Sequence, residues 1–318
     1  MSADVSVVIP FYRGAATIAR AVRSVERQAL PPREIIVVDD GSPEPLPALQ
    51  STVPVRVPRH DTNRGIPSAR NTGIRAAQGA WIGFLDQDDE WAEDKLARQW
   101  RVANAAAADP PVVFGRLLHS GGGRTPWIWP PLDAVAPLEA GGERALEALV
   151  RWGNAAPFVT LLVARRTWDR HGLLDESIRG GSDDWEYLLR IVAEGATLRF
   201  DSPPAGGWSA VHHFTGENYS AHAPRILDGD LRIVERLAER YPLILQQRDR
   251  LTARTHYTYG RYHDRAGNRR EARRHYETAA RLDPAWRAPR LARLWLVLPQ
   301  RLRDEGSRLR DWLRGWRG

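Results

Sequence analysis

The chain has 318 residues, which is long enough for a full hydrophobic core and for more than one domain. It contains no Cys, which excludes a disulfide framework and a thiolate metal site. The net charge is +7, but residues 248–318 hold 19 Arg against 8 Asp and Glu, so the preceding part is acidic.

Two further features concern the membrane. No stretch of about 18 consecutive apolar residues occurs, so we expect no transmembrane helix. The first four residues run directly into an apolar strand pattern, which leaves no room for a signal peptide. We therefore expect a cytoplasmic protein.

The N-terminal third alternates short apolar runs with amphipathic segments. Apolar runs predict strands at residues 5–12, 34–42, 53–57 and 81–85. Helical spacing predicts a helix at 14–28, and a polar loop from residue 61 leads into a second helix that ends near residue 77. Such alternation is typical of an α/β protein with a doubly wound, mostly parallel sheet.

The pattern is less regular after residue 98. We expect a helix over residues 90–101, strands over 111–118 and 158–163, a Gly-, Pro- and Trp-rich loop over 121–131, and a helix over 143–152. A further helix follows Gly180-Gly-Ser-Asp-Asp, where Ser182 or Asp183 is a suitable N-cap.

Three carboxylates, Asp86, Asp88 and Asp89, follow the strand at 81–85. Ligands of open α/β sheets bind outside the carboxyl ends of the strands. Unpaired carboxylates repel one another there, and a divalent cation with a preference for oxygen ligands, Mg²⁺ or Mn²⁺, would remove that cost. The alternative is a solvated turn at a helix N-terminus, where acidic residues are also favoured.

Polar residues also follow the strand at 34–42. A carboxylate of Asp39 or Asp40 at this edge can accept hydrogen bonds from a base or ribose, although Asp-Gly is also an ordinary turn sequence. Arg64 and Arg70 are expected near the same edge, where Arg pairs with phosphate. Surface Arg is the alternative in a chain with a single Lys, Lys95.

Four of these segments together resemble the family 2 glycosyltransferases, which have the GT-A fold. They are Val-Ser-Val-Val-Ile-Pro-Phe-Tyr at 5–12, Ile-Val-Val-Asp-Asp-Gly-Ser at 36–42, Asn-Arg-Gly-Ile-Pro-Ser-Ala-Arg-Asn-Thr-Gly at 63–73 and Gly-Ala-Trp-Ile-Gly-Phe-Leu-Asp-Gln-Asp-Asp at 79–89. The resemblance extends over roughly residues 5–200. It implies a GT-A fold followed by an α-helical C-terminal extension.

The resemblance implies roles for residues at the nucleotide end of the site. Asp40 would contact the base of a nucleoside-diphosphate sugar, and the segment from Pro10 to Tyr12 would line the same pocket. Arg70 would face the nucleotide or its diphosphate.

The family's Asp-x-Asp motif matches Asp86 and Asp88. The match implies that both bind the ribose and a Mg²⁺ or Mn²⁺ ion that holds the diphosphate, with Asp89 as an alternate metal ligand. His212 or His213 lies where relatives often carry a His near the donor, and a structural His is an equally good interpretation.

The family's catalytic base is the second residue of a Glu-Asp pair, which stands here as Asp183-Asp184. Asp184 therefore takes the base role, and the first position departs conservatively from the pattern. The alternative is that both residues only cap the following helix. One base and no covalent intermediate imply inversion at the anomeric carbon.

The predicted function is therefore an inverting, metal-dependent glycosyltransferase that moves a sugar to a hydroxyl acceptor, a saccharide or lipid-linked saccharide, in cell-surface polysaccharide or glycoconjugate synthesis. Two alternatives stay open: an inactive sugar-nucleotide-binding scaffold that acts through its tail, and a nucleotidyltransferase. The first domain is expected at residues 1–225.

Residues 226–318 are expected to form the helical extension. His256, Tyr259, Gly260 and Tyr276 have the spacing of one tetratricopeptide-like hairpin at about residues 253–286. The last segment, 301–318, has the pattern of a basic amphipathic helix, which suits peripheral contact with the inner membrane face, a protein partner or a simple capping role. No nucleic-acid-binding motif accompanies the charge.

Overall fold

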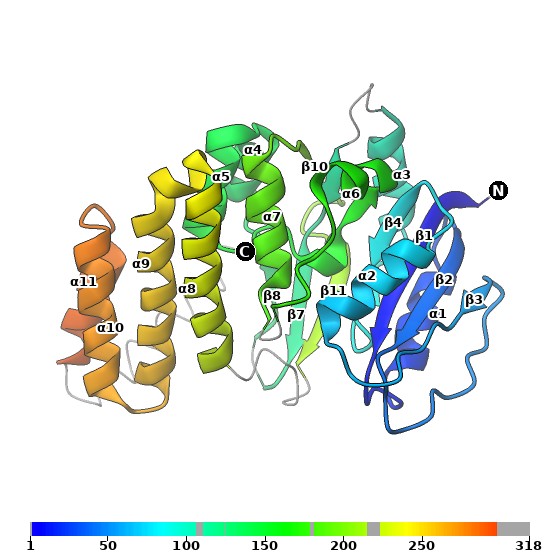
Figure 1. The fold of residues 1–318 in the computed structure, drawn as a ribbon, viewed down its shortest axis with the longest axis horizontal. Helices are drawn as coiled ribbons and strands as arrows, with labels where there is room; N and C mark the ends of the chain where they lie inside the picture. The colour runs from blue at the N-terminus through cyan, green and yellow to red at the C-terminus, as the bar shows by residue number, and fades with distance from the viewer. Residues whose placement is uncertain (1, 106–110, 124, 179–180, 215–222, 298–318) are drawn as a thin grey trace. The chain divides into compact units, whose positions relative to one another are not determined.

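The structure is a computed structural model that describes residues 2–105, 111–123, 125–178, 181–214 and 223–297. The described chain forms two compact units (Figure 1). The first contains both sheets and the helices up to Phe214, and the second contains the helices from Ala223. The sequence-based boundary at residue 225 remains a prediction.

The first unit is built on a seven-stranded sheet. Its order is β10-β6-β9-β4-β1-β2-β3, and every described neighbouring pair is parallel except those of β9 with β4 and β6. The strands are β1 Ala3–Phe11, β2 Pro32–Asp39, β3 Val55–Arg56, β4 Trp81–Phe84, β6 Val112–Phe114, β9 Leu162–Ala164 and β10 Leu198–Phe200. The predicted α/β fold with a mostly parallel sheet is confirmed.

Helices α1 Ile18–Glu26 and α2 Ile66–Ala76 cover opposite faces of this sheet, because alternate strand residues point to opposite sides. Alternate residues of β1, including Val5 and Val7, pack in one buried cluster with the apolar face of α1. Val8 points to α2, where a Cβ on Gly73 would lie 2.3 Å from its side chain. Gly73 therefore lets α2 lie close against β1, as Figure 1 shows.

A second sheet, in the order β5-β11-β7-β8, follows the acidic turn. Its strands are β5 Glu90–Trp91, β7 Leu117–Gly121, β8 Trp127–Trp129 and β11 Ala210–Phe214. Three sequence-based predictions are wrong here. Residues 90–91 form a strand rather than the start of a helix, residues 111–118 belong to two strands, and the expected loop at 121–131 contains β8.

Strand pairing and a short 3₁₀ turn explain the differences from the predicted elements. Trp91 pairs with Ala210 of β11, and its indole donates hydrogen bonds to carbonyl oxygens of Phe84 and Val159, so the helix α3 begins only at Lys95 and ends at Ala105. β9 is likewise shorter than predicted, because residues 158–160 form a 3₁₀ turn, η2 Phe158–Thr160. A partner distant in sequence decides the first case, and local periodicity does not contain it.

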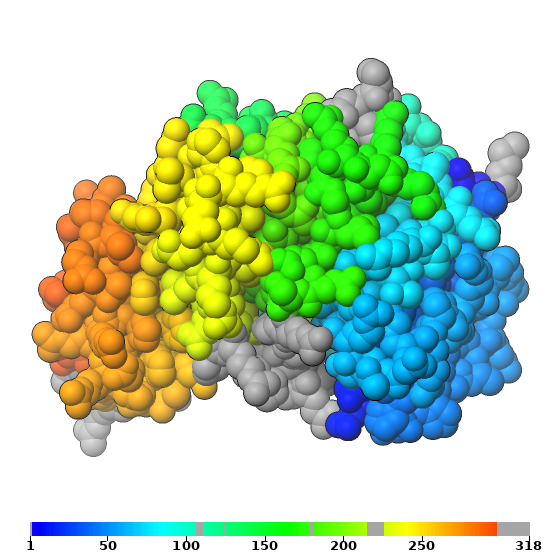
Figure 2. All heavy atoms as spheres, viewed as in Figure 1, coloured from blue at the N-terminus to red at the C-terminus, as the bar shows by residue number. Residues whose placement is uncertain are grey.

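The remaining helical segments of the first unit are η1 Leu132–Ala134, α4 Val135–Glu139, α5 Gly142–Trp152, α6 Arg165–His171 and α7 Asp183–Ala193. α5 and α7 confirm the helices predicted at these positions. The N-terminal segments of this unit, blue and cyan in Figure 2, form a continuous surface on the face shown.

The second unit consists of α8 Ala223–Arg240, α9 Pro242–Arg265, α10 Arg269–Leu282 and α11 Arg287–Leu296. α9 and α10 pack closely because Gly260 has no side chain: a Cβ there would lie 2.4 Å from the Tyr276 ring. Asn268 caps α10 by accepting a hydrogen bond from the Glu271 amide. The predicted hairpin thus exists as a helix pair, and its identity as a tetratricopeptide repeat remains a prediction.

The predicted C-terminal amphipathic helix, at 301–318, lies outside the described residues. Among the helices that the structure describes, none is both long and apolar enough to cross a membrane.

Candidate active site

The acidic turn after β4 is fixed to the end of β1 by the side chain of Gln87, the residue between Asp86 and Asp88. Gln87 accepts a hydrogen bond from the Tyr12 amide and donates one to the Tyr12 carbonyl, both at 2.9 Å. A Cβ on Gly14 would lie 2.2 Å from the Gln87 side chain, so Gly14 leaves room for this contact. The structure therefore places the half-buried Tyr12 beside the turn that carries Asp86 and Asp88, and Pro10 lies just before it in β1.

Arg70 of α2 connects this turn to α7. Arg70 is 5% exposed, and its guanidinium donates to Asp86 Oδ1 and to Asp183 Oδ2, each at 2.8 Å. It also lies over the Phe158 ring, 4.5 Å from the ring centroid. Burial alone would lower the pKa of Arg70, but the charges of Asp86 and Asp183 raise it, so the cation persists.

Sequence reasoning expected Arg70 to face a nucleotide or its diphosphate, which stays a prediction; in the structure Arg70 pairs with two protein carboxylates. The partnership with the buried Asp183 was not foreseen, since the two residues lie more than a hundred positions apart. A buried carboxylate requires a cation or hydrogen bonds, and Arg70 supplies both to Asp183.

Asp184 lies in the first turn of α7, beside Asp183. Its Oδ2 accepts a hydrogen bond from Asn154 Nδ2 at 2.5 Å, and Oδ1 accepts one from the Trp185 amide. Burial and the neighbouring charge of Asp183 raise the pKa of Asp184 to about 6. Such a group is ionised at neutral pH and is basic enough to accept a proton. Asn154 was missed, because no local sequence pattern distinguishes it.

Asp40 is buried at the end of β2 and organises the loop before α2. Its carboxylate accepts hydrogen bonds from the amides of Arg64 and Gly65 at 2.9 and 2.8 Å, and its Oδ1 lies 2.7 Å from His60 Nδ1. His60 Nε2 in turn lies 2.8 Å from Thr72 Oγ1 on α2. His60 was also missed, since a lone His in a loop gives no signal.

The neighbouring Asp39 contacts other residues of its own loop region. It accepts a hydrogen bond from the Ser42 amide at 2.8 Å and forms an ion pair with Arg59. The exposed Arg64 side chain pairs with Glu176 at 3.3 Å. Of the residues considered at this edge, Asp40 is therefore the one that connects several loops.

Asp89 is buried and holds the second sheet to the turn. Its Oδ1 lies 3.0 Å from His212 Nδ1 and accepts a 3.3 Å hydrogen bond from the His213 amide. Burial raises the pKa of Asp89 to about 7, although the contact with His212 opposes the shift. His213 Nε2 lies 2.8 Å from Glu90 Oε1. The sequence left open whether these histidines lie near the donor or are structural; in the structure the His212 side chain contacts the acidic turn and the His213 side chain contacts Glu90 of β5.

The carboxylates of the acidic turn can hold a divalent cation if a substrate supplies the remaining ligands. Among the residues that the structure describes, no three His, Asp or Glu side chains converge as a closed ligand set. Asp86 and Asp88 are both half-buried, with hard oxygen atoms at the strand end, although Asp86 Oδ1 also pairs with Arg70; Asp89 is more deeply buried and contacts His212. Two carboxylates completed by substrate phosphates are a usual arrangement for Mg²⁺, so the donor set fits such an ion.

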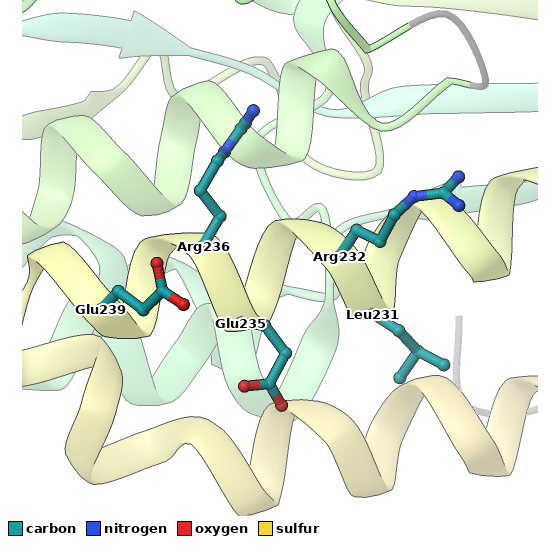
Figure 3. Close-up of a pocket in the computed structure, with 5 residues that line it drawn as sticks. All are labelled: Leu231, Arg232, Glu235, Arg236 and Glu239. Carbon is teal, nitrogen blue, oxygen red and sulfur yellow. The ribbon is translucent and has the colours of Figure 1, made fainter.

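A separate hollow of about 360 Å³ runs along α8 of the second unit (Figure 3). Arg232 and Arg236 point to one side of the helix and Glu235 to the other, with Leu231 and Glu239 completing the lining. The lining residues come from a single helix and carry charges of both signs. This hollow is not lined by the strand-end carboxylates described above.

The fold and the strand-end carboxylates together define the GT-A class of nucleotide-sugar-dependent transferases. The chain belongs to glycosyl transferase family 2, whose family model matches residues 6–169. The predicted family resemblance is thereby confirmed.

Particular relatives include two proteins of Rhizobium meliloti (strain 1021) named for succinoglycan biosynthesis. ExoO is 44% identical over 221 residues, covering 66% of this chain and 60% of ExoO. ExoU is 29% identical over 252 residues, covering 73% of this chain and 69% of ExoU. A Bacillus subtilis (strain 168) relative, the uncharacterized glycosyltransferase EpsJ, is 42% identical over 188 residues, which is 56% of this chain and 53% of EpsJ. The chain thus spans little more than half the length of ExoO and EpsJ.

Solved structures share the fold at low sequence identity. Residues 1–349 of S. aureus TarS in complex with UDP-GlcNAc superpose with a TM-score of 0.60 at 15% identity, covering 93% of this chain and 89% of that one. The mannosyltransferase PcManGT of Pyrobaculum calidifontis, in complex with GDP-Man and Mn²⁺, gives a TM-score of 0.58 at 19% identity, covering 88% and 76%. These similarities confirm the predicted GT-A fold.

Proposed function

We propose that the protein is an inverting glycosyltransferase that moves a sugar from a nucleoside diphosphate to an acceptor hydroxyl. The observation that carries the proposal is the connection Asp86–Arg70–Asp183, with Asp184 as the next residue. It joins the strand end expected to hold the donor to the first turn of α7, where a carboxylate of raised pKa is available.

In this proposal Asp40 and the segment from Pro10 to Tyr12 receive the nucleotide. Asp86 and Asp88 would hold a Mg²⁺ or Mn²⁺ ion that stabilises the negative charge developing on the diphosphate. PcManGT, which shares the fold, is in complex with GDP-Man and Mn²⁺, and this supports a metal ion together with a nucleotide sugar in the proposed reaction.

Asp184 accepts the proton of the acceptor hydroxyl as that oxygen bonds to the anomeric carbon. The bond between the anomeric carbon and the diphosphate oxygen breaks at the same centre, and the diphosphate leaves with the electron pair. Attack opposite the leaving group inverts the configuration, and no covalent enzyme intermediate is needed. Asn154 keeps the Asp184 carboxylate in one orientation.

The names of ExoO and ExoU support a role in polysaccharide or glycoconjugate synthesis, with a saccharide or lipid-linked saccharide as acceptor. Cytoplasmic location, and contact of the C-terminal helices with a membrane or a protein partner, stay predictions.

The Asp184→Asn variant tests the base assignment. We expect it to bind the nucleotide as the wild type does and to lose transfer by about 10²- to 10⁴-fold, the usual contribution of a general base. Calorimetry against UDP, GDP and their sugars with Mn²⁺ measures binding, and product analysis measures transfer. Asp169→Asn, an exposed position on α6, is the control.

Three results would contradict the proposal in different ways. Unchanged transfer in Asp184→Asn removes the base assignment. Nucleotide binding by the wild type without transfer to any acceptor supports a sugar-nucleotide-binding scaffold. Release of pyrophosphate from a nucleoside triphosphate supports a nucleotidyltransferase.

A further inference from the structure

The second sheet carries a row of aromatic rings at one end. His119 is in register with Trp127 of β8 and with His212 of β11, so the three side chains share one face. The rings of His119 and Trp127 are stacked, with centroids 4.6 Å apart. Phe214, two residues beyond His212, stacks on Trp127 at 5.5 Å. We call His119, Trp127, His212 and Phe214 the aromatic row.

The row is only partly covered. At the other end of the same face Leu117 and Ala210 are buried in the core. Trp127, in contrast, is 37% exposed, and the other rings of the row are half-buried. A Cβ on Gly121 would lie 2.9 Å from the Phe214 carbonyl, so glycine lets the end of β7 approach β11. Exposed aromatic surface next to a site often marks a binding face.

Two hydrogen-bonded connections join the row to the proposed reaction centre. His212 contacts Asp89 of the acidic turn at 3.0 Å. On the other side, the indole of Trp129 in β8 donates to the Asn154 carbonyl at 2.8 Å, and Asn154 holds Asp184. The sheet that carries the row therefore contacts both the acidic turn and the residue that holds the proposed base.

We propose that the aromatic row binds the acceptor as a saccharide, with the C–H face of a pyranose ring packed on Trp127. The inference rests on the proposed function and specifies its acceptor subsite. A pyranose has C–H bonds on its faces and hydroxyls around its rim, so it suits half-exposed rings with polar atoms beside them. His119 Nδ1, in the row, is buried without a hydrogen-bond partner in the part of the chain that the structure describes, and so is Oδ1 of Asn154, the residue that Trp129 contacts.

Saturation-transfer NMR on the full chain tests the proposal. The probes are methyl glycosides and β-linked disaccharides of glucose, galactose and mannose, added with Mn²⁺ and UDP or GDP. We expect saturation of the sugar C–H protons in the wild type and roughly three- to tenfold weaker binding in Trp127→Ala, the loss expected for one ring contact. Trp127→Phe keeps a ring and should retain most of the binding.

Trp208 provides a matched control because it has the same exposed fraction, 37%, and is not one of the stacked rings. Trp208→Ala should bind saccharide as the wild type does. Equal binding by Trp127→Ala and the wild type would overturn the proposal, and so would wild-type protein that binds UDP or GDP but no saccharide. If neither nucleotide binds, the proposed function itself fails, which is a separate result.

Discussion

At the scale of single residues, the site consists of charged side chains whose partners lie far away in the sequence and meet them only in the folded structure. Arg70 is held between Asp86 and Asp183, and Asp184 is oriented by Asn154. Burial raises the pKa of both Asp183 and Asp184, but Asp183 is paired with a cation whereas Asp184 is held by the neutral amide of Asn154. This asymmetry between Asp183 and Asp184 favours a single proton acceptor.

A first prediction concerns the pH dependence of transfer. The pKa of Asp184 is raised to about 6, so its basic form is present above that pH and is lost below it. We expect kcat/KM to fall about tenfold per pH unit below about pH 6, because only the carboxylate accepts the proton. A pH profile of the transfer rate measures this.

Asn154→Ala refines the same measurement. Asn154 donates to the charged carboxylate, so its removal should raise the pKa of Asp184 and move the midpoint to higher pH. Asn104→Ala is the control, since among the described residues the Asn104 amide donates to a carbonyl of its own helix, that of Trp100. A profile that stays flat to about pH 5 would argue against Asp184 as the base.

At the scale of elements, loops from three strand ends are fixed to one another by side chains. Gln87 joins the turn after β4 to the end of β1, and Asp40 joins the end of β2 to the loop before α2. Arg13, just after β1, donates its amide to Ser42 after β2 at 3.1 Å. The proposed donor site is thus built on loops held by a rigid sheet.

A second prediction follows for Gln87→Ala. The substitution removes two hydrogen bonds to the Tyr12 backbone and should lower the free energy of unfolding by roughly 1–3 kcal/mol. It should also weaken nucleotide binding, since Tyr12 and Asp86 would no longer be held together. Denaturant titration and calorimetry measure the two effects.

Gln78→Ala is the matched control for Gln87→Ala. The Gln78 side chain is exposed, and the hydrogen bonds of this residue to Ser6 and Glu34 use its backbone amide. Its stability and nucleotide affinity should match the wild type. Nucleotide binding that survives intact in Gln87→Ala would show that this clamp does not organise the donor site.

At the scale of the whole molecule, the chain combines an α/β unit with a unit of helices. Inside the helical unit His256, His263 and His275 lie close together, with His275 stacked on Tyr259 at 4.7 Å. Burial, together with His256 and His263, lowers the pKa of His275 to about 4. This group therefore stays neutral when folded and titrates at its ordinary, higher pKa when unfolded.

A third prediction is that the helical unit loses stability as the pH falls from about 6.5 to about 4. In that range the unfolded chain binds a proton at His275 that the folded chain does not, so stability rises with pH. Thermal unfolding followed by circular dichroism at several pH values measures this. His275→Phe keeps a stacked ring and should show a smaller pH dependence; an identical dependence would exclude His275 as its source.

The sequence by itself determined the family and most of the α/β framework. Each strand-end motif within residues 5–89 can be recognised in one short stretch of sequence, because a continuous apolar run forms the strand and the polar residues of the motif follow it directly. For the same reason α5, α7 and the α9–α10 pair were predictable from helical spacing. Asp40, Asp86, Asp88 and Asp184 were identified as candidates from their motifs alone.

Only the tertiary structure decided the second sheet and the partners of the site residues. β5 is a short strand whose pairing with β11 connects distant parts of the chain, and β8 is a short strand that pairs with the neighbouring β7; no local period reports either strand. Asn154, His60 and the aromatic row escaped notice for the same reason. A hydrogen bond or a ring contact depends on where two segments meet in space, and the sequence of either segment alone does not contain that information.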